Sequence, residues 1–439
     1  MLNASLSVTR RDVMLNASLS VTRRDVMLNV SLSVTRRDVM LNVSLSVTRR
    51  DVMLNVTRLV TLSEAETRTH TLYLMTRPIF VAANDQHVGK TTTTLALLTA
   101  FQRKGMNIGY CKPMGQEFVQ IGDACVDKDA ALFADIMPFD LEPELHSPVL
   151  TASGMTARYI ERPNEFVDLR PRIEHAGRVL QKRHELVIYE GTGHPGVGSI
   201  VGLSNAEIAR ILGAGVILVL RGGIGYTYDR MAMCKSMFDM AGVPLLGVII
   251  NKVVPEKLEK IQYYLSKRLA QDGIEILGFV PFEQELGYPL LSTIIKDLQA
   301  ELLSKDDNID CPVEDIIVGS LMDIEKLQPE TEYLLVVSVS RLQAALSNLQ
   351  TIWTRQKMRP NLIGVMLSGP KSPDMNELAF FEAHGIPVAK TNYDTYETIV
   401  KISHLEVKLN TKAPHKIERA IELFSQHVNL DRICQLVGL

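Results

Sequence analysis

Three consecutive residues have the side chains and the spacing needed to bind a phosphate. Gly89, Lys90 and Thr91 lie between an apolar run at residues 79–83 and a helical pattern at residues 91–103. In such a loop, backbone N–H groups surround a phosphate, the lysine ammonium reaches its outer oxygens, and the hydroxyl binds a metal ion. The N-terminus of the following helix also favours anions. The pattern therefore predicts a nucleotide-binding P-loop.

The entrance to this loop departs from the usual pattern. Glycine normally stands five residues before Gly89, and this chain has Asn84 there. Asn tolerates positive φ better than most residues, so we expect the loop to keep its function. His87 and His194 are of a type that serves in acid–base chemistry. Neither has a partner at a characteristic spacing, and we interpret both as surface histidines.

Short apolar segments alternate with helix-length amphipathic segments beyond residue 78. The expected strands are residues 79–83, 107–112, 185–189, 215–220, 245–251 and 274–280, and the expected helices are residues 91–103, 170–183, 206–212, 228–241 and 255–271. Strands that are apolar on both faces and separated by helices predict an α/β fold, with a parallel sheet covered by helices on both faces. Ligands bind such sheets beyond the carboxyl ends of the strands, where this loop lies.

Five segments carry a resemblance to a known family. In chain order they read AANDQHVGKTTTT, GYCKPMGQ, VDKDAALF, VIYEGTGHPGVGS and GVIINKV. Together they resemble the dethiobiotin synthetase-like branch of P-loop proteins, in which glycine stands at the place of Ala83. That branch contains ATP-dependent ligases, amidotransferases and the amino-terminal domain of long bacterial phosphotransacetylases. The resemblance covers about residues 76–303 and implies that ATP and Mg²⁺ are the cofactors.

The resemblance also implies which residues bind phosphate and metal. Lys90 and Thr91, after Gly89, would hold phosphate and Mg²⁺, and Thr92 would add a hydroxyl near the α-phosphate. Asp129 and Glu190 match the acidic metal partners of the family. Two acids and one hydroxyl suffice because Mg²⁺ keeps several waters and phosphate oxygens. For Asp129 the competing interpretation is an acid in the first turn of a helix, where the dipole favours it.

Two further residues match functional positions of the family. Lys112 corresponds to the lysine that approaches the transferred phosphoryl group, where a cation would stabilise the developing charge. The alternative for Lys112 is a solvated strand end without a catalytic role. Asn251 matches the adenine-contacting position.

A polar stretch, SKDDNIDCPVED, follows residue 303 and is typical of a linker. A second, smaller α/β unit then follows, with strands expected at residues 315–318, 333–339, 362–367 and 387–390 and helices at residues 342–356, 374–383 and 395–402. Its segments EDIIVGSLMDIEKL, PNLIGVMLSG and HGIPVAKTNYDTYETIVKI resemble the DRTGG domain, which follows the dethiobiotin synthetase-like domain in long phosphotransacetylases.

The second unit lacks the glycines that name the DRTGG domain. The sequence there is VSVSR, and only Arg341 matches the motif. A Gly-rich turn binds anions through its N–H groups, and the segment VSVSR contains no glycine. The turn SGPK at residues 368–371 offers an alternative small anion site, with a plain turn as the simpler interpretation.

The sequence predicts four parts. Residues 1–74, with four near-identical copies of a 13-residue unit and a fifth, decaying copy, are expected not to form a folded domain. The P-loop domain is expected at residues 75–303, the DRTGG-like domain at 304–410 and a helical segment at 411–439. The apolar stripe of this last segment is expected to pack on the second domain. No transacetylase catalytic domain is expected, so we do not expect acetyl transfer.

Composition restricts the classes of partner. Residues 75–439 contain 37 basic and 44 acidic residues, without the basic stripe that a nucleic-acid-binding protein needs. The longest apolar runs are shorter than the roughly 20 residues that cross a bilayer. The five cysteines are far apart, which indicates neither zinc nor disulfides. We therefore expect a cytoplasmic protein without nucleic-acid or membrane partners.

Two functions of different classes fit these features. One is a regulatory nucleotide sensor that binds ATP and Mg²⁺ and passes its state to a homo-oligomer or to a metabolic enzyme. The other is an ATP-dependent ligase of the dethiobiotin synthetase type, acting on a small carboxylate or carbamate. The tandem domains favour the sensor, and whether ATP is hydrolysed is left open. A scaffold that has lost nucleotide binding is a third, weaker alternative.

Overall fold

The computed structural model divides the chain into two compact units, residues 1–75 and 76–439. The structure describes residues 13–21, 26–34, 40–47, 78–152, 154–304, 308–319, 327–355, 361–405 and 407–439. In the first unit, β1 (Val13–Val21), β2 (Val26–Val34) and β3 (Met40–Val47) form an antiparallel three-stranded sheet. Each copy of the repeat alternates apolar and polar residues, as a half-buried strand does. That residues 1–74 form no folded domain of their own stays a prediction. The fifth repeat copy lies outside the described residues.

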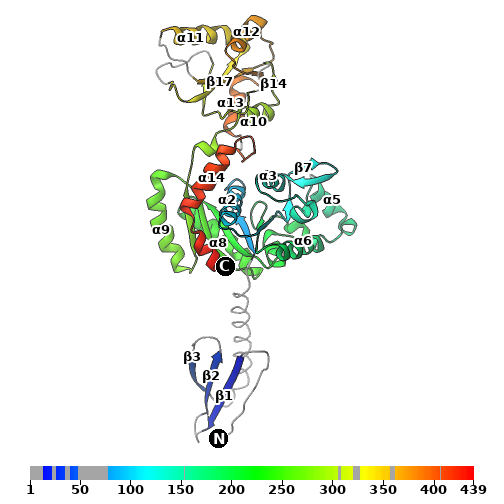
Figure 1. Cartoon of the computed structure of the whole chain (residues 1–439), viewed down its shortest axis with the longest axis vertical. Coiled ribbons are helices and arrows are strands. Elements are labelled where there is room, and N and C mark those ends of the chain that lie inside the picture. Colours follow the sequence, from blue (N-terminus) through cyan, green and yellow to red (C-terminus); the bar gives the residue numbers. More distant parts are fainter. Residues whose placement is uncertain are drawn as a thin grey trace. The chain divides into compact units, whose positions relative to one another are not determined.

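A six-stranded parallel sheet forms the centre of the P-loop domain (Figure 1). Its strands, in sheet order, are β13 (Ile276–Pro281), β12 (Leu245–Val253), β11 (Gly215–Arg221), β4 (Ile79–Ala83), β10 (Leu186–Glu190) and β5 (Ile108–Cys111). The α/β fold is confirmed, and each strand lies where the apolar runs predict it. The first strand, β4, is central, so the loop that follows it emerges where the strand order reverses.

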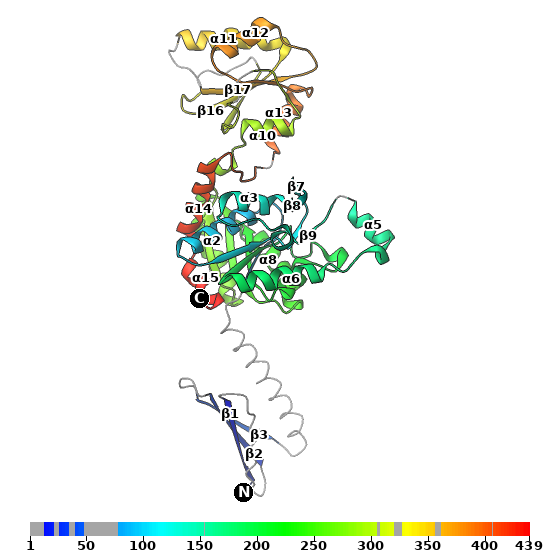
Figure 2. The same cartoon turned by 45° about the vertical axis from the view of Figure 1, so that its right-hand side comes forward.

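Helices cover both faces of this sheet (Figure 2). Side chains alternate along β4: Val81 faces α2 (Lys90–Arg103) and α3 (Lys128–Ile136), whereas Phe80 faces the opposite layer. The opposite layer contains α6 (Arg170–Arg183), α7 (Asn205–Ile211), α8 (Gly225–Met240) and α9 (Leu258–Gln271). An additional hairpin, β7 (Phe118–Ile121) and β8 (Ala124–Asp127), leads into α3.

A five-stranded sheet forms the second domain. Its order is β14 (Glu301–Leu302), β18 (Val388–Lys390), β17 (Asn361–Ser368), β16 (Glu332–Ser338) and β15 (Asp315–Val318), and only β14 is antiparallel to its neighbour. One face packs on α11 (Leu342–Arg355) and α12 (Met375–Ala383). The other packs on α10 (Leu291–Asp297) and α13 (Thr395–Ser403). Residues 320–326 of the DRTGG-like segments lie outside the described residues.

The predicted domain boundary after residue 303 is wrong. Leu291, Ile294 and Leu298 are buried in the core of the second sheet, and β14 pairs with β18. The second domain therefore begins at α10. The polar stretch after residue 303 is a loop within this domain, since its composition marks exposure and not a domain border.

The C-terminal helices belong to the P-loop domain, which corrects the prediction that they pack on the second domain. On α14 (Pro414–His427) and α15 (Leu430–Val437), the residues Ile417, Phe424 and Ile433 are buried in the same core as α2 and β13. The amphipathic spacing predicts that a helix buries one face, but it contains no information about which surface covers that face. The second domain is thus an insertion between β13 and α14.

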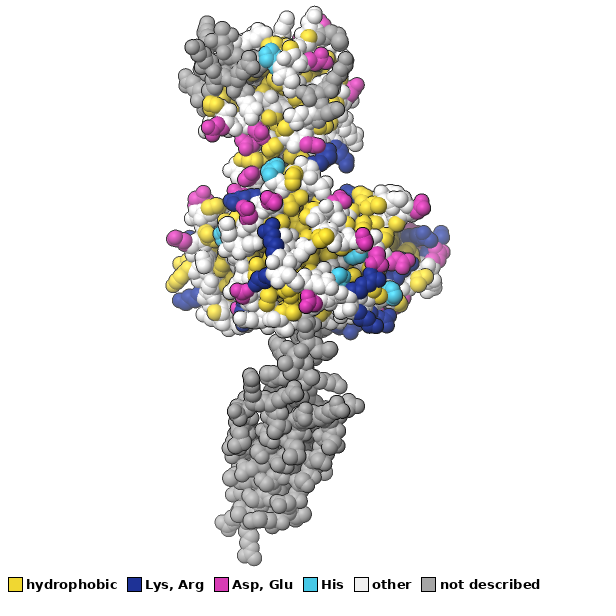
Figure 3. All heavy atoms as spheres, in the orientation of Figure 1, with side chains coloured by type: hydrophobic (Ala, Val, Ile, Leu, Met, Phe, Trp, Pro, Cys, Tyr) yellow, Lys and Arg dark blue, Asp and Glu magenta, His cyan; other side chains and the backbone are white. Residues whose placement is uncertain are grey.

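Within the described parts of the chain, every helix is too short or too polar to cross a membrane. On the face drawn in Figure 3, basic and acidic side chains are mixed over the P-loop domain.

Candidate nucleotide-binding site

The loop between β4 and α2 has two left-handed residues. Gly89, which precedes the first residue of α2, has φ +103°, and His87 has φ +56°. Asn84 does not have positive φ, so the expectation that its tolerance of that region preserves the loop is wrong. Asn84 is instead buried beside β11, and its N–H donates to Val219 O at 3.3 Å. Both His87 and His194 are exposed, as predicted.

Side chains at the end of β12 donate hydrogen bonds to the backbone of this loop. Asn251 is buried, its Nδ2 donates to Val88 O at 2.8 Å, and its Oδ1 accepts from Lys252 N–H at 2.8 Å. Lys252 Nζ donates to His87 O, also at 2.8 Å. Both ends of the Asn251 amide therefore contact protein backbone, and the side chain stabilises the loop conformation. Its contact with adenine stays a prediction.

Replacing Gly89 with alanine is expected to disrupt this support. A Cβ at Gly89 would overlap with Asn251 Nδ2, and φ +103° is unfavourable for an L side chain. We expect G89A to weaken ATP binding by at least about tenfold, because the loop N–H groups would shift. The control is G105A, which also has positive φ but nothing within 4 Å of its added Cβ. Equal ATP affinity of G89A and G105A, measured by calorimetry, would contradict this role of Gly89.

Lys90 is folded back onto its own loop. Its Nζ donates to Asp85 O at 3.0 Å, and the side chain is buried. Burial lowers the pKa of Lys90 to about 8, although Glu190 opposes the shift. A buried ammonium with one hydrogen bond in the described structure has donors left for an anion such as a phosphate.

Thr91 and Glu190 meet at the mouth of the loop. Thr91 Oγ1 donates to Glu190 Oε1 at 2.7 Å, and the Glu190 side chain is 1% exposed at the end of β10. Because the hydroxyl hydrogen is directed at Glu190, the oxygen lone pairs remain available for a metal ion. Burial raises the pKa of Glu190 to about 7. Thr92, one residue further along α2, is half-buried.

Lys112 joins the same cluster from the end of β5. Its Nζ pairs with Asp129 Oδ2 and lies 3.5 Å from Asp127 Oδ1 and 3.9 Å from Glu190 Oε1. Burial opposes the charge of Lys112, but the three carboxylates outweigh it and raise its pKa. The interpretation of Lys112 as a solvated strand end is wrong. The structure therefore brings Lys90, Thr91, Lys112, Asp129 and Glu190 together.

Sequence reasoning missed Asp127. Its Oδ1 accepts from Asp129 N–H at 2.9 Å, which caps α3 and orients Asp129. Asp127 is 1% exposed, and Gly115 leaves the space for it, because a Cβ there would overlap with its carboxylate. An acid before the helical run DAALF is the signal for an N-cap, and the close approach to Lys112 could not be inferred from the sequence.

The predicted Mg²⁺ site needs phosphate oxygens as additional ligands. Within the described residues, no group of three or more His, Cys, Asp or Glu side chains is arranged to hold a metal alone. Thr91 and Glu190 are in contact, and Asp129 pairs with the Lys112 ammonium that lies 3.9 Å from Glu190 Oε1, so an ion here would be completed by nucleotide and water. Bound Mg²⁺ would neutralise phosphate charge and would be held by Thr91 and the two acids.

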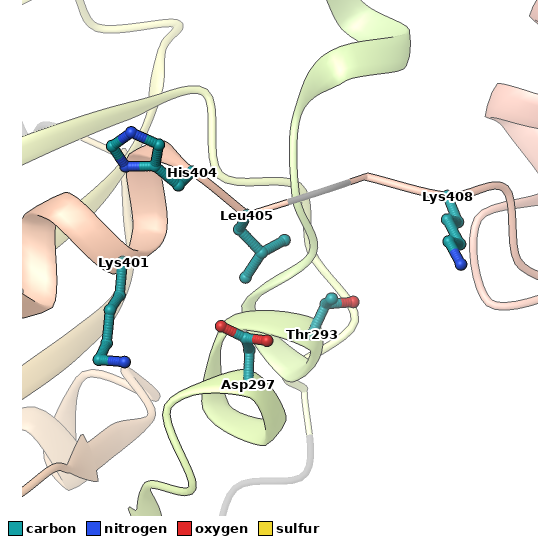
Figure 4. Close-up of a pocket in the computed structure, with 6 residues that line it drawn as sticks. All are labelled: Thr293, Asp297, Lys401, His404, Leu405 and Lys408. Atoms are coloured by element: carbon teal, nitrogen blue, oxygen red, sulfur yellow. The ribbon is translucent and has the colours of Figure 1, made fainter. Parts of the chain in front are cut away.

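The second domain presents weaker candidates for anion binding. A pocket of about 450 Å³ is lined by Thr293, Asp297, Lys401, His404, Leu405 and Lys408 (Figure 4). Its basic residues are accompanied by an acid. At the predicted anion turn, Gly369 N–H donates to Tyr393 O at 2.7 Å and is thus not available to a ligand. The segment with Arg341 forms a short 3₁₀ turn, Val339–Arg341.

Comparisons with known proteins match the domain that contains this site. The AAA domain family model matches residues 77–289. These residues form a P-loop domain, and the chain is homologous to dethiobiotin synthetases and to the N-terminal region of phosphate acetyltransferases. Phosphate acetyltransferase of Nitrosomonas europaea is 23% identical over 379 residues, 82% of this chain and 51% of that protein. ATP-dependent dethiobiotin synthetase of Anaeromyxobacter dehalogenans is 25% identical over 210 residues, 48% of this chain and 92% of that protein.

These relatives differ in how much of the chain they cover. The chain spans about half the length of the phosphate acetyltransferases that it matches, and an alignment over 82% of the chain includes the second domain as well. Among solved structures, the septum site-determining protein MinD of Pyrococcus horikoshii, complexed with Mg-ADP, has a TM-score of 0.31. It is 17% identical and covers 48% of this chain and 84% of its own.

Proposed function

We propose that the P-loop domain binds ATP with Mg²⁺. The observation that carries this proposal is the Thr91–Glu190 hydrogen bond at 2.7 Å, directly after Gly89 and Lys90 at the start of α2. It places a hydroxyl, a carboxylate and an ammonium around one point beyond the sheet. Positive charge and helix N–H groups there would bind phosphate, and the hydroxyl and carboxylate would bind the metal.

We further propose that the chain is a regulatory nucleotide sensor, in which the DRTGG-like domain passes the nucleotide state to a homo-oligomer or a metabolic enzyme. The relationship to the N-terminal region of phosphate acetyltransferases supports this role, because it extends over both domains. The segment between α13 and α14, which leads from the second domain back to the P-loop domain, has a contact near the site. Glu117 Oε1 accepts from Lys408 at 2.8 Å, and its Oε2 accepts from Lys128, between Asp127 and Asp129, at 3.0 Å. Both lysines lower the pKa of Glu117 to about 2.

The position of Lys112 favours a second candidate function. A buried lysine among three acids beside Lys90 is placed to stabilise a phosphoryl group during transfer. This arrangement supports an ATP-dependent ligase of the dethiobiotin synthetase type. Both functions fit a protein located in the cytoplasm.

Two measurements on the whole protein test these proposals. ATP titrations in excess Mg²⁺ and in EDTA should show binding that Mg²⁺ strengthens; absence of binding would contradict both functions. ADP release is then measured without substrate and with diaminopelargonate and bicarbonate. A sensor is expected to release ADP slowly, and at the same rate with and without the substrates. Rapid release only with the substrates would overturn the sensor and support the ligase.

A further inference from the structure

The Glu190 carboxylate is held on both oxygens. Oε1 accepts from Thr91 Oγ1 at 2.7 Å, and Oε2 accepts from Tyr110 Oη at 3.3 Å. Lys112 Nζ lies 3.9 Å from Oε1 and leaves Oε2 to the phenol. Because Glu190 is buried, water cannot substitute freely for a lost partner.

The packing of β5 against α3 holds Tyr110 next to this carboxylate. Tyr110 and Lys112 are two residues apart at the end of β5, so both side chains face the layer of α2 and α3. The Tyr110 ring packs edge-on against Phe133 of α3, with centroids 4.3 Å apart. A carboxylate oxygen accepts, so the phenol O–H of Tyr110 is the donor in this hydrogen bond.

We propose that Tyr110 is a positioning residue for the metal partner Glu190. The inference rests on the proposed binding of Mg-ATP. The phenol fixes the rotation of the carboxylate, so that Oε1 faces Thr91 and the metal position. Without the phenol, Oε2 loses its hydrogen bond, and the carboxylate rotates toward Lys112 or Thr91 to regain one. The Thr91 hydroxyl would then turn with it.

The test is the substitution Y110F, which removes one oxygen and keeps the ring packing. ATP affinity is measured by calorimetry in excess Mg²⁺ and in EDTA, and the ratio of the two affinities reports metal coupling. Partners that orient a metal ligand typically change metal affinity by about tenfold or more. We expect Y110F to lower the ratio by about tenfold, with the affinity in EDTA unchanged.

Tyr189 provides a matched control. It precedes Glu190 on β10, is also buried, and its hydroxyl accepts a hydrogen bond from Gln181 at 3.0 Å. Its side chain points into the opposite core layer. Y189F should therefore lose comparable thermal stability but keep the wild-type ratio of affinities.

A double-substitution cycle tests whether Tyr110 acts through Glu190. In an E190Q background, Y110F should produce no further change in the Mg²⁺ ratio, since the carboxylate is already absent. An unchanged ratio in Y110F, an equal loss in EDTA, or full additivity with E190Q would each overturn the inference. If Y110F does not fold, as judged by its thermal unfolding, a wild-type ratio in Y110L or Y110M that folds would likewise overturn it, because neither side chain can donate a hydrogen bond. Absence of ATP binding by the wild-type protein would instead contradict the proposed function.

Discussion

Replacing Lys90 with alanine is expected to reduce ATP affinity by about a hundredfold while leaving the protein folded. The lost ammonium is buried at the start of α2, where it can reach phosphate oxygens with little competition from water. Among the described residues, its hydrogen bond is to Asp85 O, at 3.0 Å. Removing a buried charge with so few partners should not lower stability, and it can increase it.

The combination of lost binding and unchanged stability distinguishes this prediction from a general disruption. Calorimetry gives the ATP affinity, and thermal unfolding by circular dichroism gives the stability. Lys235 provides the control because it lies on α8 of the same domain, is partly exposed and is paired with Asp239. K235A should change neither quantity appreciably, since exposed ion pairs contribute about 1 kcal/mol or less. Normal ATP affinity in K90A would contradict the P-loop interpretation.

Removing residues 409–439 is expected to unfold the P-loop domain, although the AAA domain match ends at residue 289. These residues bury a set of apolar side chains in the core formed with α2 and β13: Ile417, Ile421, Leu423, Phe424, Val428, Ile433 and Val437. Burying each large apolar side chain contributes about 1.5–3 kcal/mol. The summed loss, about 10–20 kcal/mol, is as large as or larger than the roughly 5–15 kcal/mol by which a typical domain is stable. We expect the shortened protein to aggregate or to lose cooperative unfolding.

A single substitution on α14 tests the same core contact with a smaller expected loss of stability. Phe424 is buried on α14, and F424A should destabilise the P-loop domain by about 3–5 kcal/mol. ATP binding should weaken with it, because α2 carries Lys90 and Thr91 and packs against the same core. Glu418 on α14 is exposed, so E418A is the matched control and should have little effect. A cooperative, wild-type thermal transition in F424A would show that these helices are not part of the domain core.

The sequence by itself determined the elements and the phosphate-binding loop. Apolar runs such as residues 79–83 and 215–220 predict central strands because both faces of a parallel strand are buried. The GKT triplet between a strand and a helix has few other structural explanations. Family resemblance supplied Lys112, Asp129 and Glu190, which the fold brings into one cluster.

Only the tertiary structure decided which surfaces meet. The pattern of α14 indicates one buried face equally well for either domain, and the choice of the P-loop domain arises from contacts between residues far apart in the chain. The same reason explains why α10 was assigned to the wrong domain and why Asp127 and Tyr110 were missed. Local periodicity encodes how a segment folds, whereas the partners of a buried side chain depend on how the sheets and helices pack together.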